Sequence, residues 1–256
     1  MSRVSCKSAG ELALMRESGR IVSEVLTLIG SHVRPGVTTG ELDAMAEEYI
    51  RAQGGVPAFK GYGPDKRNLF PATLCVSIDD VVVHGIPGGR TLEEGQVVSV
   101  DVGVKKDRYF GDAARTFAVG RISDEKRRLL HVTEEALYEG IRQARAGNHL
   151  HDISAAVQRH VEGAGFSVVR DLVGHGIGKN LHEEPAVPNY GTPGTGILLK
   201  EHMTLAIEPM VNAGTSVVRM DDDGWTVRTA DGKPSAHFEH TVVITNDEAE
   251  ILTRHG

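Results

Sequence analysis

Four acidic residues of this chain lie in or beside apolar segments that resemble β-strands. Asp101 interrupts the valine-rich run of residues 97–104, Asp112 precedes AARTFAV, Glu208 lies within TLAIEPMV, and Glu239 precedes HTVVIT. A carboxylate in such surroundings is costly to bury unless it shares a proton, pairs with a cation or binds a metal ion. Each acid taken alone is explained equally well by an ion pair with a nearby Arg or Lys.

A histidine joined to these acids favours metal chemistry. His175 stands in GHGIG, residues 174–178, where the glycines would allow close approach of the backbone, although a plain turn would use them too. Four carboxylates in one pocket cannot all stay ionised without about two divalent cations to neutralise them. Carboxylate oxygens with one imidazole favour Mn²⁺, Fe²⁺ or Co²⁺ over thiolate-bound zinc. The residues predict a two-metal hydrolase and leave its substrate open.

A β-hairpin over residues 97–119 is expected to bring two of the acids together. Valines at alternate positions from 98 to 104 indicate a strand with one buried face, followed by a turn over 105–108 and a returning strand over 113–119. If the turn is centred on Lys106-Asp107, Asp101 faces Asp112, where like charges repel unless a cation lies between them. The alternative is that Asp112 belongs to a loose Gly-Asp turn.

The rest of the chain predicts two successive helix–helix–strand units, which hints at two similar halves. Apolar residues at helical spacing predict helices over 8–30 and 38–54, and again over 123–147 and 148–163. The residues expected to cap them are Ser8, Thr38, Ser123 or Asp124, and Asn148. Residues 56–71 are expected to form a functional loop. Strands are expected over 72–78, 166–173, 203–211 and 240–245.

Composition excludes several classes of protein. Hydrophobic residues make up 40% and charged residues 25% of the 256, which is typical of a globular chain and not of a disordered one. The net charge of −7 offers no broad basic surface for nucleic acid. No signal peptide or membrane span is visible, and Cys6 and Cys75 cannot form a disulfide framework. We therefore expect a soluble, cytoplasmic protein without membrane or nucleic-acid partners.

Six stretches match one enzyme family in order and spacing: VVVHGIP (81–87), VDVGVKKDRYFGDAART (100–116), GHGIGKNLHEEP (174–185), TLAIEPMVNAG (204–214), DGWTVRTADG (223–232) and SAHFEHTVVIT (235–245). Over nearly its whole length the chain resembles type I methionine aminopeptidases. The resemblance implies the pita-bread fold of the α/β (α+β) class, with two pseudo-symmetric halves, antiparallel sheet inside and helices outside, as one catalytic domain over residues 1–256. It also implies the reaction, in which a hydroxide bound to two metal ions removes the N-terminal methionine from nascent polypeptides whose second residue is small.

The resemblance assigns the metal ligands position by position. Asp101 would chelate one ion, Asp112 and Glu239 would bridge both, and His175 and Glu208 would complete the shell of the other. Glu208 would also carry a proton during the reaction. The implied cofactors are two divalent ions, Co²⁺, Mn²⁺ or Fe²⁺.

The resemblance also assigns the substrate contacts. His84 and His182 match two histidines that are not ligands, contact the scissile amide and stabilise the tetrahedral intermediate. From the sequence alone, however, His84 is explained as well by a structural role, and Trp225 by a place in the core. The residues implied to line the methionine pocket are Phe59, Tyr62, Phe70, Cys75 and Trp225.

This chain departs from the family pattern at three places. Residues 64–69 form an insertion in the pocket loop, Leu181 stands where many relatives have an aromatic residue, and His237 replaces a glutamine-like residue as a further candidate contact for metal or substrate. The family also implies a monomer that acts on nascent polypeptide N-termini. Any contact with the ribosome would come from the catalytic domain itself.

Two alternatives remain from the sequence. The first is an X-Pro aminopeptidase of the same fold, although such relatives carry an additional N-terminal domain and further histidines near the second ligand cluster. The second is a non-catalytic pita-bread binding module, although such proteins have lost ligands that this chain retains.

Overall fold

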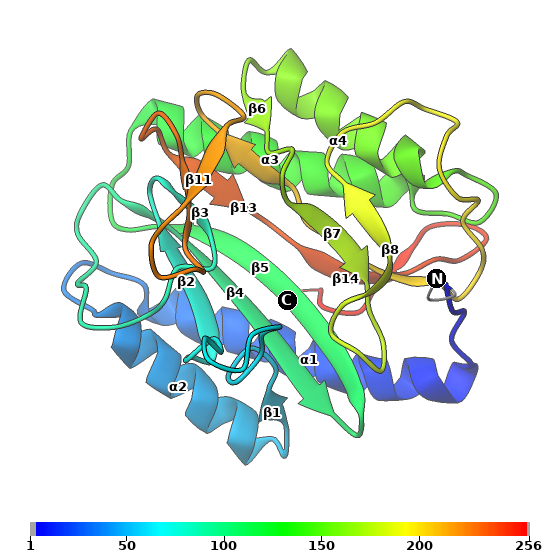
Figure 1. The fold of residues 1–256 in the computed structure, drawn as a ribbon, viewed down its shortest axis with the longest axis horizontal. Helices are drawn as coiled ribbons and strands as arrows, with labels where there is room; N and C mark the ends of the chain where they lie inside the picture. The colour runs from blue at the N-terminus through cyan, green and yellow to red at the C-terminus, as the bar shows by residue number, and fades with distance from the viewer. Residues whose placement is uncertain (1–3, 255–256) are drawn as a thin grey trace.

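Two pairs of helices flank a layer of strands in the computed structural model, which describes residues 4–254 (Figure 1). The first pair is α1 (Ala9–His32) and α2 (Thr39–Ala52), and the second is α3 (Asp124–Gln143) and α4 (Leu150–Gly163). Strands follow each pair along the chain. This order confirms the expected arrangement of two halves with helices outside and antiparallel sheet inside.

The strand β4 organises the first half. Its partner β5 pairs along one edge, and β1 and β2 pair with the other, all antiparallel. The β1 strand occupies the start of the predicted loop over 56–71, and β2 begins two residues later than expected. The strands of this half are β1 (Val56–Pro57), β2 (Leu74–Ile78), β3 (Val81–Val83), β4 (Val97–Lys106) and β5 (Tyr109–Ala118).

Three antiparallel sheets build the second half. They have the strand orders β15-β14-β9-β7-β8, β13-β10-β6 and β11-β12-β3, and the last of these joins the two halves through β3. The strands are β6 (Ser167–Val168), β7 (Val173–Gly176), β8 (Glu183–Pro188), β9 (Thr204–Ile207), β10 (Met210–Asn212), β11 (Val218–Met220), β12 (Val227–Thr229), β13 (Ser235–His237), β14 (His240–Val243) and β15 (Glu250–Ile251).

Two of the strands predicted in this half prove to be interrupted. The segment 166–173 is paired only at β6 and at the first residue of β7. The segment 203–211 divides into two strands at Glu208-Pro209, and proline, which has no N–H for the ladder, explains this break. The strand predicted over 240–245 is confirmed as β14, and a separate strand, β13, precedes it across Phe238-Glu239.

Side-chain caps begin the helices largely as predicted. Ser8 with Glu11 and Thr38 with Glu41 form capping boxes, and Ser123 caps α3. The prediction for α4 was wrong by one residue, because α4 begins after His149, whose N–H donates to the Asp152 carboxylate at 2.7 Å. The amide of Asn148 instead donates to the carbonyl of Gln143 at 2.9 Å.

The predicted register of the β4–β5 hairpin was also wrong. The strands continue to Lys106 and from Tyr109, so the turn is centred on Asp107-Arg108, both with positive φ, at 48° and 75°. Asp101 therefore faces Ala114, and Asp112 faces Gly103. The difference is two residues, which leaves both carboxylates on one face of the sheet as diagonal neighbours. The loose-turn alternative for Asp112 is excluded, because Asp112 is paired within β5.

Each half has its own hydrophobic core. One core cluster packs α1 and α2 against β2, β4 and β5, and a second packs α3 and α4 against strands of the other half. A smaller cluster, which includes Met15, Phe70 and Leu252, lies between them. Within residues 4–254, no helix has the length and apolar character needed to cross a membrane.

Two glycines allow α1 to pack closely on its neighbours. A Cβ atom added at Gly111 of β5 would lie 2.8 Å from the backbone nitrogen of Gly19 in α1, so the absence of this atom lets the helix approach β5. A Cβ atom at Gly19 would press on the backbone carbonyl of Leu252, which follows β15, so its absence lets the helix approach that segment. Neither neighbour is a flexible side chain that could move aside.

We expect Gly19→Ala to destabilise the protein by about 1–3 kcal/mol, the usual cost of overpacking a tight interior. The matched control is Gly10→Ala in the same helix, where an added Cβ meets nothing within 4 Å. That change should be neutral or stabilise by up to about 1 kcal/mol through helix propensity. Urea unfolding of both variants measures the difference, and equal stabilities would contradict the packing argument.

Glu11 fixes the start of α1 to two other segments. Its carboxylate accepts hydrogen bonds from Ser8 N–H at 2.8 Å and from the Tyr109 hydroxyl at 2.7 Å, and it lies 2.9 Å from Lys179 Nζ. The Ser8 N–H, followed by Tyr109 and Lys179, lowers the pKa of Glu11 from 4.5 to about 2. The folded state therefore binds this proton more weakly than the unfolded state does.

A depressed folded pKa stabilises the protein above the unfolded pKa of about 4.5, and that stabilisation is lost as the pH falls toward 2. We expect Glu11→Gln to lower the free energy of unfolding at pH 7 by about 1–2 kcal/mol, allowing for partial solvent screening. The deficit relative to wild type should shrink between pH 5 and pH 3 in urea titrations. Glu17→Gln on the same helix is the control, and its free energy of unfolding should differ from that of wild type by less than about 0.5 kcal/mol at pH 7 and at pH 3.

Candidate metal centre

One cavity of about 130 Å³ gathers the acidic, imidazole and apolar residues singled out in the sequence. Strands of both halves and the loops that cover them contribute to its walls. The lining residues are Phe59, Tyr62, Phe70, Cys75, His84, Asp101, Asp112, His175, His182, Glu208, Trp225 and Glu239. The structure thus places all twelve predicted site residues together.

The β4–β5 hairpin carries the first two carboxylates. Asp101 and Asp112 are diagonal neighbours on the face that turns to the cavity. The backbone of Asp112 is tied to the second half, because its N–H donates to the Thr241 hydroxyl at 3.0 Å and its carbonyl accepts from that hydroxyl at 2.7 Å. A side chain of β14 therefore fixes the position of Asp112.

The other two carboxylates lie opposite each other in the second half. Ile207 pairs with His240 in the β9–β14 ladder, and Met210 pairs with His237 in the β10–β13 ladder. The register is the same on both sides of the break, so Glu208 and Glu239 occupy facing positions within it. The N–H of Glu239 donates instead to the carbonyl of Ala114 in β5, at 2.9 Å, which brings the two halves together at this level.

His175 completes the cluster from β7, the strand beside β9. Its Nε2 lies 3.6 Å from Glu208 Oε1 and 3.9 Å from Asp112 Oδ2. Its Nδ1 donates to the carbonyl of Gly176 at 2.9 Å, which fixes the tautomer and leaves the Nε2 lone pair facing the carboxylates. Burial, assisted by the charge of His182, lowers the pKa of His175 to about 3. The imidazole is therefore neutral and able to bind a cation.

The carboxylates lack the partners that buried charges need. Within residues 4–254, no Lys or Arg forms an ion pair with any of the four, which rules out the ion-pair explanation for them. In the same range, Asp101 Oδ1, Asp112 Oδ1 and Glu239 Oε1 are buried without a hydrogen-bond partner. An unpaired buried carboxylate costs several kcal/mol. Burial and then mutual repulsion raise the pKa of Asp101, Glu208 and Glu239 well above the ordinary value.

These donors fit divalent metal ions. Ligand atoms of Asp112, His175 and Glu239 lie within 4.8 Å of one another, and so do those of Glu208, His237 and Glu239. Carboxylate oxygens with a neutral imidazole form a donor set suited to first-row divalent cations. A divalent charge would neutralise carboxylates that have no other cation near them. The buried unpaired oxygens are the strongest observation for this fit.

Two further histidines stand at the side of the carboxylates. The His84 backbone has a positive φ of 58°, and His84 hydrogen-bonds the main chain of Trp225. Burial and the charge of His182 lower the pKa of His84 to about 4. His182 lies between β7 and β8, with its ring 4.2 Å from that of His175 and its Nδ1 2.6 Å from the Tyr62 hydroxyl. Both imidazoles face the cavity beside the carboxylates.

The apolar end of the cavity is built from loops and from β2. Phe59, Phe70 and Cys75 are buried, and the Phe70 ring meets Trp225 edge to face at 5.3 Å. Tyr62 is 39% exposed and hydrogen-bonds His182, so it lies at the opening of the cavity and not at its base. Leu181 does not line the cavity and packs in the small core cluster between the two halves.

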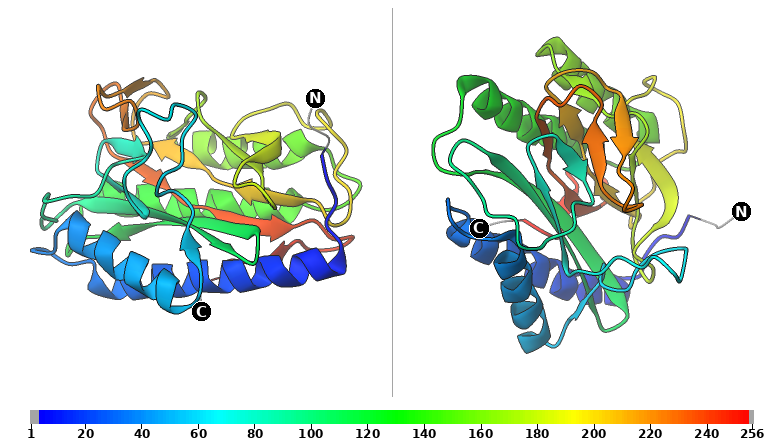
Figure 2. Two further views of the ribbon diagram at one scale, coloured as in Figure 1. Left: turned by 60° about the horizontal axis from the view of Figure 1, so that its bottom comes forward. Right: turned by 60° about the vertical axis from the view of Figure 1, so that its left-hand side comes forward.

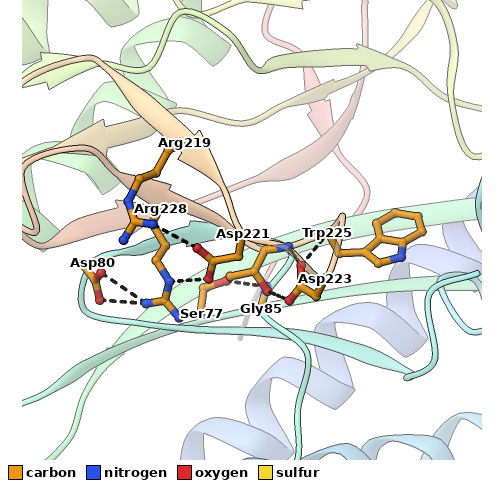
Figure 3. Close-up of polar contacts among 9 residues, drawn as sticks. Ser77, Asp80, Gly85, Arg219, Asp221, Asp223, Trp225 and Arg228 are labelled. Carbon is orange, nitrogen blue, oxygen red and sulfur yellow. Dashed lines mark hydrogen bonds and ion pairs between the residues drawn. The ribbon is translucent and has the colours of Figure 1, made fainter. Parts of the chain in front are cut away.

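The turn that carries Trp225 is anchored by ionic contacts that the sequence analysis missed. Figure 3 shows Arg228 of β12 between Asp80, at 3.1 Å, and Asp221, at 2.5 Å. The Asp223 carboxylate accepts from the Trp225 N–H at 2.8 Å within the same turn. Isolated acids and arginines are common on surfaces, so only the run Asp221-Asp222-Asp223 could have drawn attention to this segment.

The segment of residues 64–69, predicted to be an insertion, contacts this turn. The Asn68 amide donates to the backbone carbonyl of Asp223 at 3.0 Å. The loop after β1 and the β11–β12 hairpin both stand on the side of the sheets away from α1 and α2, where the apolar end of the cavity lies (Figure 2, left). The insertion therefore braces the turn of Trp225 from outside.

Comparison with known proteins agrees with this geometry. Residues 13–246 match the model of metallopeptidase family M24. Methionine aminopeptidase 1 of Bacillus subtilis is 51% identical over 98% of this chain and 99% of its own length. The crystal structure of methionine aminopeptidase from Rickettsia prowazekii superimposes with a TM-score of 0.95 at 40% identity, over 98% of this chain and all of that one.

More distant structures share only the fold. Prolidase from Pyrococcus furiosus superimposes with a TM-score of 0.78 at 21% identity, and the match spans 98% of this chain but 66% of the prolidase. The predicted fold, two halves with an inner antiparallel sheet, is therefore confirmed, and the buried carboxylate and histidine groups fit the use of divalent metal ions in a metallopeptidase family. The chain belongs to metallopeptidase family M24.

Proposed function

We propose that this protein is a methionine aminopeptidase, which removes the N-terminal methionine from nascent polypeptides when the second residue is small. The observation that carries the proposal is the convergence of four carboxylates, two buried (Asp112 and Glu239) and two partly buried (Asp101 and Glu208), without Lys or Arg partners in the described chain, beside a neutral histidine and an apolar pocket. The likeness to methionine aminopeptidases over the full length of the chain supports it.

The proposed metal ligands are those expected from the sequence, and the cofactors are two divalent ions, Mn²⁺, Fe²⁺ or Co²⁺. Asp101 would hold one ion and Asp112 with Glu239 both, while His175 and Glu208 would complete the shell of the other. Such ions, when bound, lower the pKa of a coordinated water and polarise the scissile carbonyl. The 3.6 Å separation of His175 Nε2 and Glu208 Oε1 supports a shared ion at that position.

The proposed roles of the protein groups follow from their protonation and position. Because burial lowers the pKa of His84 and of His182, both are neutral near pH 7. His182 can donate one N–H to the substrate carbonyl or amide. The single N–H of neutral His84 bonds the main chain of Trp225, so its other nitrogen can accept a hydrogen bond from the substrate amide or amine. The Tyr62 hydroxyl orients His182. Glu208 is proposed to pass a proton to the leaving amine, because its carboxyl lies within the cavity beside the ligand groups.

The apolar end is proposed to select methionine. Its lining suits the thioether of a methionine side chain, because sulfur packs favourably against aromatic rings: Phe70 and Trp225 meet edge to face there, beside the buried Cys75 thiol. A pocket of this kind discriminates by only about 1–3 kcal/mol per methylene. Strict selection therefore requires fixed walls, and the anchoring of the Trp225 turn by Arg228 and Asn68 would provide them.

We further propose that residues 1–256 act as one catalytic domain, as a cytoplasmic monomer. The site draws its ligands from both halves, which supports a single functional unit. The sequence cysteines, Cys6 exposed and Cys75 buried, are both free, in keeping with a reducing compartment. Contact with the ribosome, where nascent chains emerge, would use the surface of this domain.

We expect turnover of Met-Ala-Ser to exceed that of Ala-Pro by at least about 100-fold, because the pocket offers walls for a methionine side chain. The protein is first stripped of metal with a chelator, which should abolish activity. It is then assayed with measured additions of Mn²⁺ or Co²⁺, which should restore it. Preference for Ala-Pro would favour an X-Pro aminopeptidase. A protein that binds neither ion would favour a non-catalytic binding module.

We expect Asp101→Asn and Glu239→Gln each to lower kcat/KM by more than about 100-fold, because removing a metal ligand should cost more activity than removing a residue that only hydrogen-bonds a ligand. Saturating Mn²⁺ should stabilise wild type by about 2.7 kcal/mol at 100 times its Kd, and should stabilise the variants much less. Glu201→Gln, at an exposed acid, is the control. Full activity in either ligand variant would exclude the assignment, and circular dichroism establishes that the variants fold.

A further inference from the structure

His237 is a buried imidazole that the proposed reaction does not yet use. It is 2% exposed, and its Nε2 has no hydrogen-bond partner among residues 4–254. This nitrogen lies 3.5 Å from Glu208 Oε2. This separation is a few tenths of an ångström beyond an ordinary N–H···O hydrogen bond. A buried N–H that lies so near a carboxylate and lacks any other partner would gain by bonding to it.

The two oxygens of Glu208 face two different imidazoles. Oε1 lies 3.6 Å from His175 Nε2, and Oε2 lies 3.5 Å from His237 Nε2. A carboxylate that ligates a metal through one oxygen commonly accepts a hydrogen bond at the other, and this bond fixes its orientation. The arrangement fits an ion on the side of Oε1 and His175, with His237 on the opposite side.

The main chain of His237 is held rigidly. The N–H of His237 donates to the Thr116 hydroxyl at 2.9 Å, and that hydroxyl donates to the carbonyl of His237 at 2.8 Å. The Thr116 hydroxyl also lies 2.8 Å from that of Ser99 in β4. In addition, His237 pairs with Met210, two residues beyond Glu208. The imidazole therefore projects from a strand fixed to both halves, as an orienting group must.

We propose that His237 is a positioning residue for Glu208: its Nε2–H donates to Oε2 and turns Oε1 toward the metal ion that Glu208 shares with His175. This inference rests on the proposed function. A neutral imidazole with its proton on Nε2 has one N–H to donate, and Glu208 Oε2 at 3.5 Å is the acceptor that faces it. His237 acts through Glu208 and does not itself touch the ion.

The competing assignment makes His237 a ligand. One of its ring nitrogens belongs with Glu208 and Glu239 to a group of donors within 4.8 Å, beside the group of Asp112, His175 and Glu239. Ions held by these two groups would leave Asp101 outside both, although its Oδ1 is buried without a partner. The positioning role leaves the ions on the side of Asp101 and Asp112, and is therefore favoured.

The test compares His237→Gln with His237→Met, two side chains of similar length of which only glutamine can donate an N–H. Mn²⁺ binding is measured by calorimetry on the full-length protein, and the nitrogens bonded to Mn²⁺ are counted by pulsed electron paramagnetic resonance. We expect His237→Gln to bind Mn²⁺ within about 3-fold of wild type and His237→Met to bind 10–100-fold more weakly. Wild type and both variants should show one directly bonded imidazole, that of His175.

The outcomes separate the alternatives. Two bonded imidazoles in wild type and one in His237→Gln would overturn the proposal and make His237 a ligand. Unchanged Mn²⁺ affinity in a folded His237→Met variant would also overturn the proposal, because His237 would then have no role in metal binding. If His237→Met does not fold, the nitrogen count in wild type and His237→Gln still decides between positioning and ligation. Wild type that binds no Mn²⁺ would instead overturn the metal centre itself. His131→Met, at a 70% exposed histidine of α3, is the control.

Discussion

The cost of gathering four carboxylates in one cavity, two of them buried and two partly buried, is the constraint on which the rest of the structure depends. Each one loses hydration, and each repels the others, so that burial and like charge both raise the pKa values of Asp101, Glu208 and Glu239. A flexible chain would relieve this by turning the acids toward water. The fold prevents it by placing each acid in or next to a strand with paired neighbours.

The two halves meet where this cost is concentrated. The Ala114 carbonyl accepts the N–H of Glu239, and the Thr241 hydroxyl bonds both backbone groups of Asp112. These contacts join β5 to β14 through the main chain of the acids themselves. The carboxylates therefore cannot move apart without breaking the contacts that join the halves. We infer that the cavity is preorganised before any ion binds, which reduces the reorganisation that binding requires.

The sequence predicted the chemistry of the site better than its geometry. The acids could be found because each one breaks an apolar pattern, and helix caps could be found because Ser8 and Thr38 precede a glutamate at the right spacing. The hairpin register could not be fixed, because the turn at Asp107-Arg108 adopts positive φ without the glycine that would have marked it. The facing pair of Glu208 and Glu239 was invisible as well, since it depends on a register shared by two interrupted ladders.

The same reasoning explains why the two ends of the cavity differ in how they are built. Charged donors must be held against repulsion, and backbone ladders with many hydrogen bonds provide the required stiffness. The apolar end bears no such force, so loops beside β2 are sufficient there. Side-chain contacts hold the turn of Trp225: Arg228 pairs with Asp80 and Asp221 (Figure 3), and Asn68 donates to the backbone of Asp223. Changes in these loops would reshape the pocket without disturbing the carboxylates. The metal site and the selectivity of the pocket can therefore vary independently.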